Sequence, residues 1–220
     1  MQQTKGRTMT AQIPDHVIYQ QQQYAIAGVH GNGLFTPESL DLKPTMMSTA
    51  CWRGYVADYT VINERLVLVG LTIRTDDDTY PPVDGMQPEG HVTLGGMRYA
   101  GLNIPVGFSG SLLIGRDFIR ETYVHMGFHK PSQYRHVLEL ICVDGQVLEV
   151  LDRSQETAEE RAEKRFEQRL WAAARGEEPG QRMRNIAHID KPGLLRWIEK
   201  RFSLNEDSDE DDTIDIMGKN

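Results

Sequence analysis

Four side chains of metal-binding type recur at four-residue spacing in the middle of the chain: Asp117, Glu121, His125 and His129. On an α-helix this spacing would place all four on one face, and carboxylates with imidazoles are a ligand set suited to zinc or iron. His136 could join them from the next strand. One alternative is therefore a metal-dependent enzyme with Glu121, His125 and His129 as ligands, in which a divalent ion lowers the pKa of a bound water.

The same segment also has the features of a strand, in which case the helical stripe does not form. Gly127 and Pro131 shorten any helix, and the sequence Thr122-Tyr123-Val124 is rich in residues favoured in strands. The competing interpretation is a set of solvated carboxylates and hydrogen-bonded histidines.

Two glycine-rich segments match catalytic or phosphate-binding loops only in part. Ser109 lies between Gly107-Phe108 and Gly110-Ser111, but the nucleophile elbow of serine hydrolases needs glycine two residues after the serine. His30 and Asp58 precede Ser109 in an order that a triad permits, yet a glycine-bent strand is the simpler interpretation. The segment 28–33 lacks the Lys-Ser/Thr ending of a P-loop and is predicted to be a turn.

Uncommon residues gather between Ala50 and Tyr55. Arg53 could stack on Trp52 or Tyr55, or it could bind a carboxylate. If the mouth of a barrel holds a small ligand, we expect Trp52 and Arg53 near its rim. The alternative is that these aromatic residues simply enter a core strand.

Strand and turn signals dominate from Val17 to Asp152. Tyr55 to Arg74 is predicted to be a hairpin around Asn63-Glu64-Arg65, and His136 to Leu151 a second hairpin with a type I′ turn at Asp144-Gly145. Further strands are expected over His16 to Val29, including the exposed Gln20 to Gln23 run, and over Ile104 to Gly115. Thr75 to Gly96 is expected to be a long surface loop.

Two amphipathic helices are predicted after the strands. Ser154 or Thr157 can cap the first helix, and Thr157 with Glu160 has the spacing of a capping box. Helix-forming residues continue to Ala174, with Gly176 placed to end them, and Glu160 precedes Lys164 by four residues, a favourable pair. Asp190 and Pro192 open the second, shorter helix.

Composition limits the classes of partner. The 220 residues are 39% apolar and 25% charged, with a formal net charge of −8. This acidic balance disfavours nucleic acid or an anionic membrane and favours a basic protein partner. Neither a signal peptide nor a membrane span is visible, so a soluble cytoplasmic protein is expected. Cys51 and Cys142 are too few for a disulfide framework and are expected to be small core residues.

The C-terminal part changes charge sharply. Between Arg161 and Phe202 there are eleven Lys/Arg against six Asp/Glu, and an acidic run follows from Glu206. The tail can serve only as a solubilising, self-shielding extension. Alternatively, an apolar anchor enters a partner groove while the acidic run attracts a basic surface. The predicted partner-binding residues are Leu194, Trp197, Ile198, Phe202, Asp207, Asp209, Glu210, Asp211 and Asp212.

Together these patterns predict an α+β chain. A flexible N-terminus (1–11) precedes a β-rich barrel or two-sheet sandwich (12–152), a helical extension (153–203) and a disordered acidic tail (204–220). The function they favour is a protein-interaction module, such as an inhibitor, an antitoxin-like neutraliser or an adaptor that binds a basic protein. The alternatives are the metal-dependent enzyme and a small-ligand-binding β-barrel.

Overall fold

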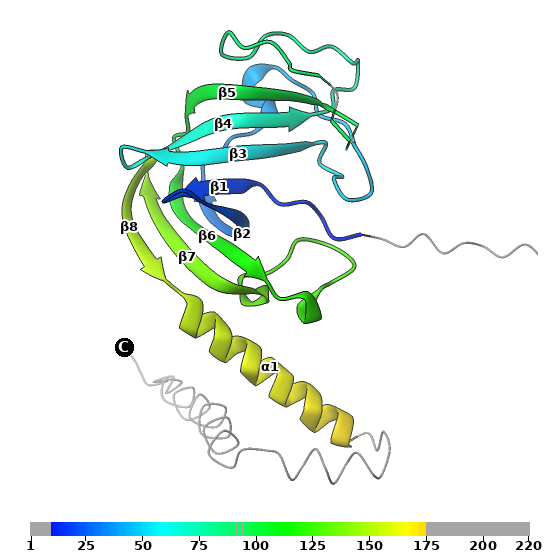
Figure 1. Ribbon diagram of the computed structural model, residues 1–220, viewed down its shortest axis with the longest axis vertical. Coiled ribbons are helices and arrows are strands. Elements are labelled where there is room, and N and C mark those ends of the chain that lie inside the picture. Colours follow the sequence, from blue (N-terminus) through cyan, green and yellow to red (C-terminus); the bar gives the residue numbers. More distant parts are fainter. Residues whose placement is uncertain (1–9, 91, 94, 175–220) are drawn as a thin grey trace, which may run out of the picture. The chain divides into compact units, whose positions relative to one another are not determined.

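The computed structural model describes residues 10–174, with the exception of residues 91 and 94 (Figure 1). This part of the chain is β-rich and contains one α-helix. The strands are β1 (His16–Tyr19), β2 (Gln22–Asn32), β3 (Tyr55–Ile62), β4 (Arg65–Ile73), β5 (Met97–Pro105), β6 (Ser109–Phe118), β7 (Tyr134–Val143) and β8 (Gln146–Asp152). The helices are the 3-10 turns η1 (Pro37–Leu40), η2 (Arg120–Thr122) and η3 (Pro131–Gln133), and the α-helix α1 (Ser154–Ala174).

Seven strands close into a barrel, so the barrel is the correct one of the two predicted β architectures. The ring runs β3-β1-β2-β6-β7-β8-β4 and returns to β3, while β5 pairs with β4 outside it. Neighbouring strands are antiparallel except for β1 and β3. The β4–β8 closure is short: Arg65 is paired with Gln146, and the Val147 amide donates to the Glu64 carbonyl at 2.7 Å.

Both predicted hairpins are confirmed. Asn63 and Glu64 connect β3 to β4 with φ of 48° and 62°, and Asp144 and Gly145 connect β7 to β8 with φ of 47° and 76°. Positive φ at both central residues is the conformation of the type I′ turn, whose twist matches that of the strands. At Gly145 an added Cβ would lie 2.1 Å from the Val106 carbonyl oxygen, so the close approach of the chain also requires glycine.

Other strand boundaries differ from the prediction. Gln20 and Gln21 have φ of 49° and 62° and form the β1–β2 turn, so the prediction of one strand segment through Gln20 to Gln23 was wrong. The predicted strand over Ile104 to Gly115 is likewise two strands, because β5 ends at Pro105 and β6 begins at Ser109. The loop predicted over Thr75 to Gly96 is confirmed, and its described residues form only isolated bridges.

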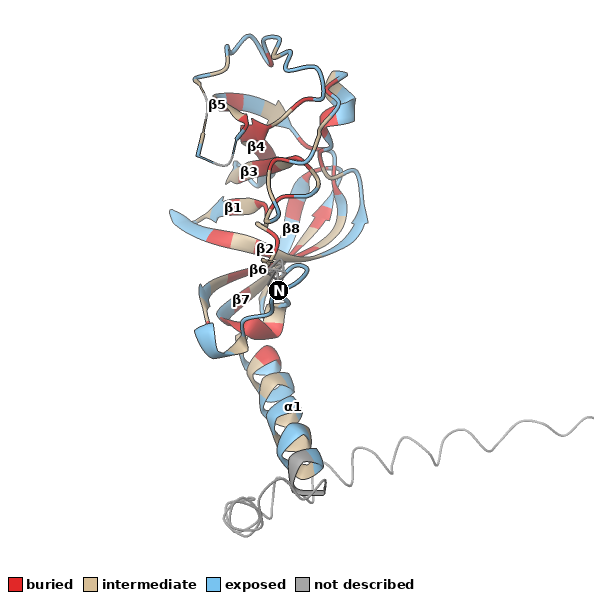
Figure 2. Cartoon of the chain, turned by 90° about the vertical axis from the view of Figure 1, so that its right-hand side faces the viewer, coloured by how far each residue is buried: buried red, intermediate tan, exposed pale blue. Residues whose placement is uncertain are grey.

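The barrel interior is filled by side chains, and buried residues gather along the strands in Figure 2. Cys51 and Cys142 are each 1% exposed, as expected for small core residues. Twenty-one of the buried residues form one hydrophobic cluster. The largest fully buried side chains are Tyr59, Tyr99, Phe108, Leu66, Leu68, Leu71, Ile73, Leu112, Ile114, Leu140, Val17 and Val137.

A polar network crosses neighbouring strands β1, β3, β4 and β5. Asp58 of β3 contacts His16 Nδ1 of β1 at 3.3 Å and Arg98 NH1 of β5 at 3.1 Å. Arg98 reaches Asp58 across β4 because Gly70 occupies the intervening position, where an added Cβ would lie 3.0 Å from Asp58 Oδ2. The missing side chain of Gly70 therefore permits an ion pair between strands that are not adjacent.

Helix α1 begins at Ser154, one of the two residues predicted to cap it, but the Ser154 hydroxyl is hydrogen-bonded to the Val137 backbone. The Asp152 carboxylate accepts the Ser154 amide at 2.8 Å. Thr157 lies inside the helix and donates its hydroxyl to the Arg153 carbonyl, so the predicted Thr157–Glu160 capping box was wrong. The predicted Glu160–Lys164 ion pair forms.

The boundary between two compact units of the chain falls within α1, after Ala158. The predicted second helix and acidic tail lie outside the described residues. Within residues 10–174, apart from 91 and 94, no helix combines the length and apolar character needed to cross a bilayer.

Candidate functional site

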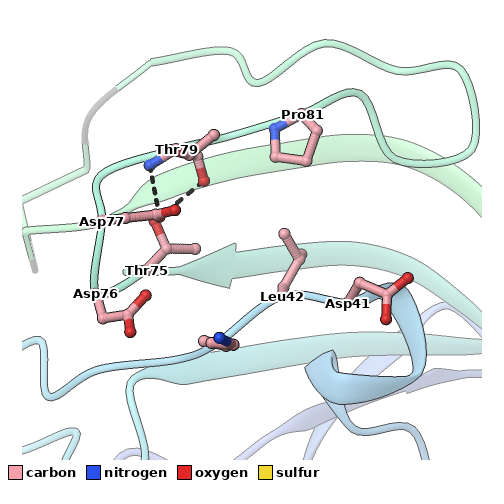
Figure 3. Close-up of a pocket in the computed structure, with 8 residues that line it drawn as sticks. Asp41, Leu42, Thr75, Asp76, Asp77, Thr79 and Pro81 are labelled. Carbon is pink, nitrogen blue, oxygen red and sulfur yellow. Dashed lines mark hydrogen bonds between the residues drawn. The ribbon is translucent and has the colours of Figure 1, made fainter.

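A surface pocket of about 380 Å³ lies between two loops of the first unit (Figure 3). One wall comes from residues 41–43, directly after η1, and the other from residues 75–81, directly after β4. Backbone contacts tie the loops together. Pro44 bridges to Thr75, and the Asp76 amide donates to the Lys43 carbonyl at 3.2 Å. These main-chain contacts hold the pocket at the open end of the β3–β4 hairpin, where β4 finishes, away from the Asn63-Glu64 turn.

The lining of this pocket is acidic. Asp41, Asp76 and Asp77 contribute three exposed carboxylates, against the single ammonium group of Lys43. Buried Leu42 and exposed Pro81 add an apolar strip beside the carboxylates. A pocket of this kind suits a long side chain that carries a cation on an aliphatic stem, because such side chains bury the stem and leave the charged end among polar groups.

The three carboxylates differ in whether they have hydrogen-bond partners. The Thr79 backbone amide donates a hydrogen bond to the Asp77 carboxylate at 3.0 Å. This bond, together with one from the Thr79 side chain, holds the pKa of Asp77 below its usual value. Asp77 therefore stays ionised and also fixes the turn through Thr79. Among the described residues, the carboxylates of Asp41 and Asp76 have no hydrogen-bond or ion-pair partner, so both are available to a ligand.

The predicted metal residues do not come together on a helix. Asp117 is the second-to-last residue of strand β6, Glu121 lies in the three-residue turn η2, and His125 and His129 follow outside any helix. The helical stripe is therefore wrong, because β6 continues to Phe118 and uses the first position of the stripe as strand. Across residues 10–174 without 91 and 94, no three His, Cys, Asp or Glu side chains are grouped so that they could hold a metal ion.

The two histidines pack against aromatic rings. His129 lies 4.3 Å from Phe118 and 5.3 Å from Tyr123, measured between ring centroids, and burial lowers its pKa. His125 contacts the edge of Tyr123 at 5.3 Å. Asp117 and His136, the outer members of the predicted set, are paired with each other at 3.4 Å between Oδ2 and Nε2.

Arg53 is committed to an ion pair inside the protein. Its NH1 donates to Asp15 Oδ2 at 2.7 Å and its NH2 donates to Asp15 Oδ1, while its guanidinium lies 4.5 Å from the Tyr55 ring centroid. Trp52 is 47% exposed. Neither Trp52 nor Arg53 lines the acidic pocket.

The serine-centred triad does not assemble, although His30 lies on β2 opposite Ser111 of β6, two positions from Ser109. Ser109 Oγ accepts the Asp144 amide at 2.9 Å and so fixes the β7–β8 turn. Asp58 is engaged by His16 and Arg98, not by His30. Ser109 and Asp58 therefore have structural partners that account for them.

The acidic pocket was not among the predicted sites. The run Asp76-Asp77-Asp78 was visible as part of a loop, but nothing in the sequence paired it with Asp41, 35 positions earlier. The predicted partner-binding residues lie outside the described part of the chain: Leu194, Trp197, Ile198, Phe202, Asp207, Asp209, Glu210, Asp211 and Asp212.

Comparisons with known proteins do not assign the chain to a family. No protein-family model, curated protein or solved structure matches the chain.

Proposed function

We propose that this chain is a protein-interaction module that binds a basic segment of a protein partner. The observation that carries the proposal is the pocket in which Asp41, Asp76 and Asp77 lie beside the apolar Leu42 and Pro81. A lysine or arginine of the partner would place its stem against the apolar strip and its cation among the carboxylates.

Charge on a larger scale favours the same class of partner. The net charge of −8 attracts a basic surface and raises the rate of encounter, while the pocket supplies a local point of attachment. The acidic run that contains Asp207 to Asp212 lies outside the described residues and has the same sign. Inhibitor, neutraliser and adaptor are all roles that such binding would serve.

A titration with basic peptides tests the proposal. Labelled full-length chain is titrated with a short lysine- and arginine-containing peptide, and amide shifts are followed by NMR spectroscopy. The expected result is a saturable shift at residues 41–43 and 75–79 that weakens as salt is added. Site-specific shifts distinguish the pocket from diffuse attraction to the acidic tail.

A double substitution gives the matched comparison. Asp41→Asn and Asp76→Asn remove two carboxylates and leave Asp77 to hold the turn; asparagine also tolerates the left-handed backbone of Asp41, where φ is 55°. We expect binding to weaken by roughly three- to tenfold at low salt, because exposed ion pairs contribute modestly. The control Glu64→Gln and Glu121→Gln removes two exposed carboxylates elsewhere.

Two results would count against the proposal. One is peptide-induced shifts that avoid the pocket, and the other is an equal loss of affinity in the pocket and control variants. If free lysine or arginine amide gave the same affinity as the peptide, a small cationic ligand would be the better description of the partner.

A further inference from the structure

The edge of strand β8 has no strand partner over most of its length. β8 meets β4 at Gln146 and Val147, and beyond that point the described contacts pair it only with β7 (Figure 1). Leu148 on this strand is 60% exposed. An unpaired strand edge presents free amide and carbonyl groups and is a template for another strand.

The ladder with β7 identifies the groups that point outward. The Arg153 amide donates to the Val137 carbonyl, so Val137 and Arg153 form a hydrogen-bonded pair. Hydrogen bonding alternates along an antiparallel ladder, and the register pairs Glu139 with Leu151 and Leu140 with Val150. Val150 and Asp152 therefore direct their main-chain groups away from β7. No described backbone group accepts or donates there.

The other edge of the sheet is protected. β5 is covered by the loop before it: the Glu89 amide donates to the Arg98 carbonyl, and the Asn103 amide donates to an Asp84 carboxylate. The β8 edge has no such cover among the described residues and contains neither lysine nor proline, two residues that commonly protect edges. The difference marks β8 as a surface for strand addition.

We propose that β8 pairs antiparallel with β8 of a second copy of this chain, about a two-fold axis at Leu151. This register places Val150 of each copy against Asp152 of the other, and the outward groups then exchange roughly four main-chain hydrogen bonds. It also places Leu151 against Leu151, an apolar pair across the axis.

Charge complementarity favours this register and a second copy of the chain as the partner. With the axis at Leu151, Glu149 of one copy lies opposite Arg153 of the other, and the pair occurs twice by symmetry. Arg153 is also paired within its own chain with Glu139 at 2.7 Å and Glu156 at 3.1 Å, so Glu149 would join an existing ion-pair cluster. Glu149, Leu151 and Arg153 share one face of the strand, because successive side chains alternate and Val150 packs against the core. Like charges are not opposed anywhere in the register from residue 149 to residue 153.

The oligomeric state of the full chain tests the proposal. Sedimentation velocity and light scattering are measured from the low micromolar to the high micromolar range. Wild-type chain is expected to shift from monomer to dimer as concentration rises. Hydrogen exchange at the Val150 and Asp152 amides is expected to slow over the same range.

Two substitutions probe the edge, one at a main-chain amide that the described part of the monomer leaves unpaired and one at the exposed Glu149 side chain. Val150→Pro removes an amide that points away from β7, a position where an edge strand tolerates proline. Because the Val150 side chain packs on the core, circular dichroism checks the fold of the proline variant. Glu149→Lys places a lysine opposite Arg153 of the other copy. For each variant, the protein concentration at which the dimer forms should rise at least tenfold. Glu121→Lys, an exposed charge reversal elsewhere, should leave that concentration unchanged.

The outcomes separate clearly. A dimer that is lost in both edge variants, kept in Glu121→Lys and matched by intact circular dichroism supports the proposal. Wild-type chain that stays monomeric over the whole range, or a dimer that survives both edge substitutions, overturns it. An edge used instead by a strand of a different protein would give the monomeric result.

Discussion

Replacing Arg53 by methionine tests how much one buried ion pair contributes to the fold. Asp15, whose side chain is 7% exposed, accepts hydrogen bonds from both terminal nitrogens of Arg53 and from the Ala57 amide at 2.6 Å. Arg53→Met removes two of these three donors and leaves the carboxylate buried beside a thioether. The variant thus keeps much of the side-chain volume and loses the charge.

The expected loss follows from burial. Breaking a buried ion pair by removing one partner costs about 3–5 kcal/mol, because the remaining charge is uncompensated. The Arg53 side chain is 27% exposed, so some water can reach the vacated position, and we expect the lower end, about 3 kcal/mol. For a chain of this size the midpoint of thermal unfolding should fall by roughly 6–12 °C.

Urea unfolding followed by circular dichroism measures the change, with two companion variants. Arg53→Lys supplies a point charge without the bidentate fork or the contact with the Tyr55 ring, so an intermediate loss is expected. The double variant Asp15→Asn with Arg53→Met removes both charges, keeps an oxygen to accept the Ala57 amide and should recover most of the loss.

The refuting result is equally specific. A loss below about 1 kcal/mol for Arg53→Met would place this pair among exposed salt bridges and not among buried ones. A double variant as unstable as Arg53→Met would show that lost packing, and not an unpaired carboxylate, causes the destabilisation.

Two further predictions follow from the shifted pKa values. Burial alone would raise the pKa of Asp58, but the hydrogen bond from His16 and the charge of Arg98 outweigh it and leave the pKa below the usual 3.8, so this contribution to stability is present above about pH 4 and is lost as the pH falls through the folded-state pKa. Asp58→Asn should therefore reduce stability at neutral pH and flatten its decline below pH 4 in urea titrations at stepped pH; an unchanged pH profile would contradict this. Burial raises the pKa of Cys142 to about 11 and also raises that of Cys51, so neither thiol should react with iodoacetamide at pH 8 until urea unfolds the chain. Labelling of the folded chain at the rate of free glutathione, read by mass spectrometry, would refute it.

Local chemistry explains what the sequence predicted correctly. Asp144-Gly145 between two apolar runs favours a type I′ turn by itself, since both positions must adopt positive φ and glycine does so at no steric cost. The start of α1 at Ser154 and its Glu160–Lys164 pair also depend on residues within a turn or two of each other. Such features need no knowledge of the rest of the fold.

Long-range strand pairing explains the misplaced elements. Asp117, Glu121, His125 and His129 have helical spacing, but pairing of β6 with β7 up to Phe118 takes the first of them into a strand. The Gln20 to Gln23 run had no residue that marks a turn, yet Gln20 and Gln21 adopt left-handed conformations so that β1 can return along β2. In both cases long-range strand pairing outweighed local preference.

The amino-acid sequence alone determined the β-rich character of residues 12–152, both tight hairpins, the first helix and the acidic balance, because each depends on neighbours in the chain or on composition. Only the tertiary structure decided that the strands close into a barrel, that Asp41 lines the same pocket as Asp76 and Asp77, and that Arg98 reaches Asp58 over Gly70. Asp41 lies 35 and 36 positions before Asp76 and Asp77, Arg98 lies 40 positions after Asp58, and the closing strands pair Arg65 with Gln146, 81 positions later. The energy of such contacts depends on register and closure, which no local pattern specifies.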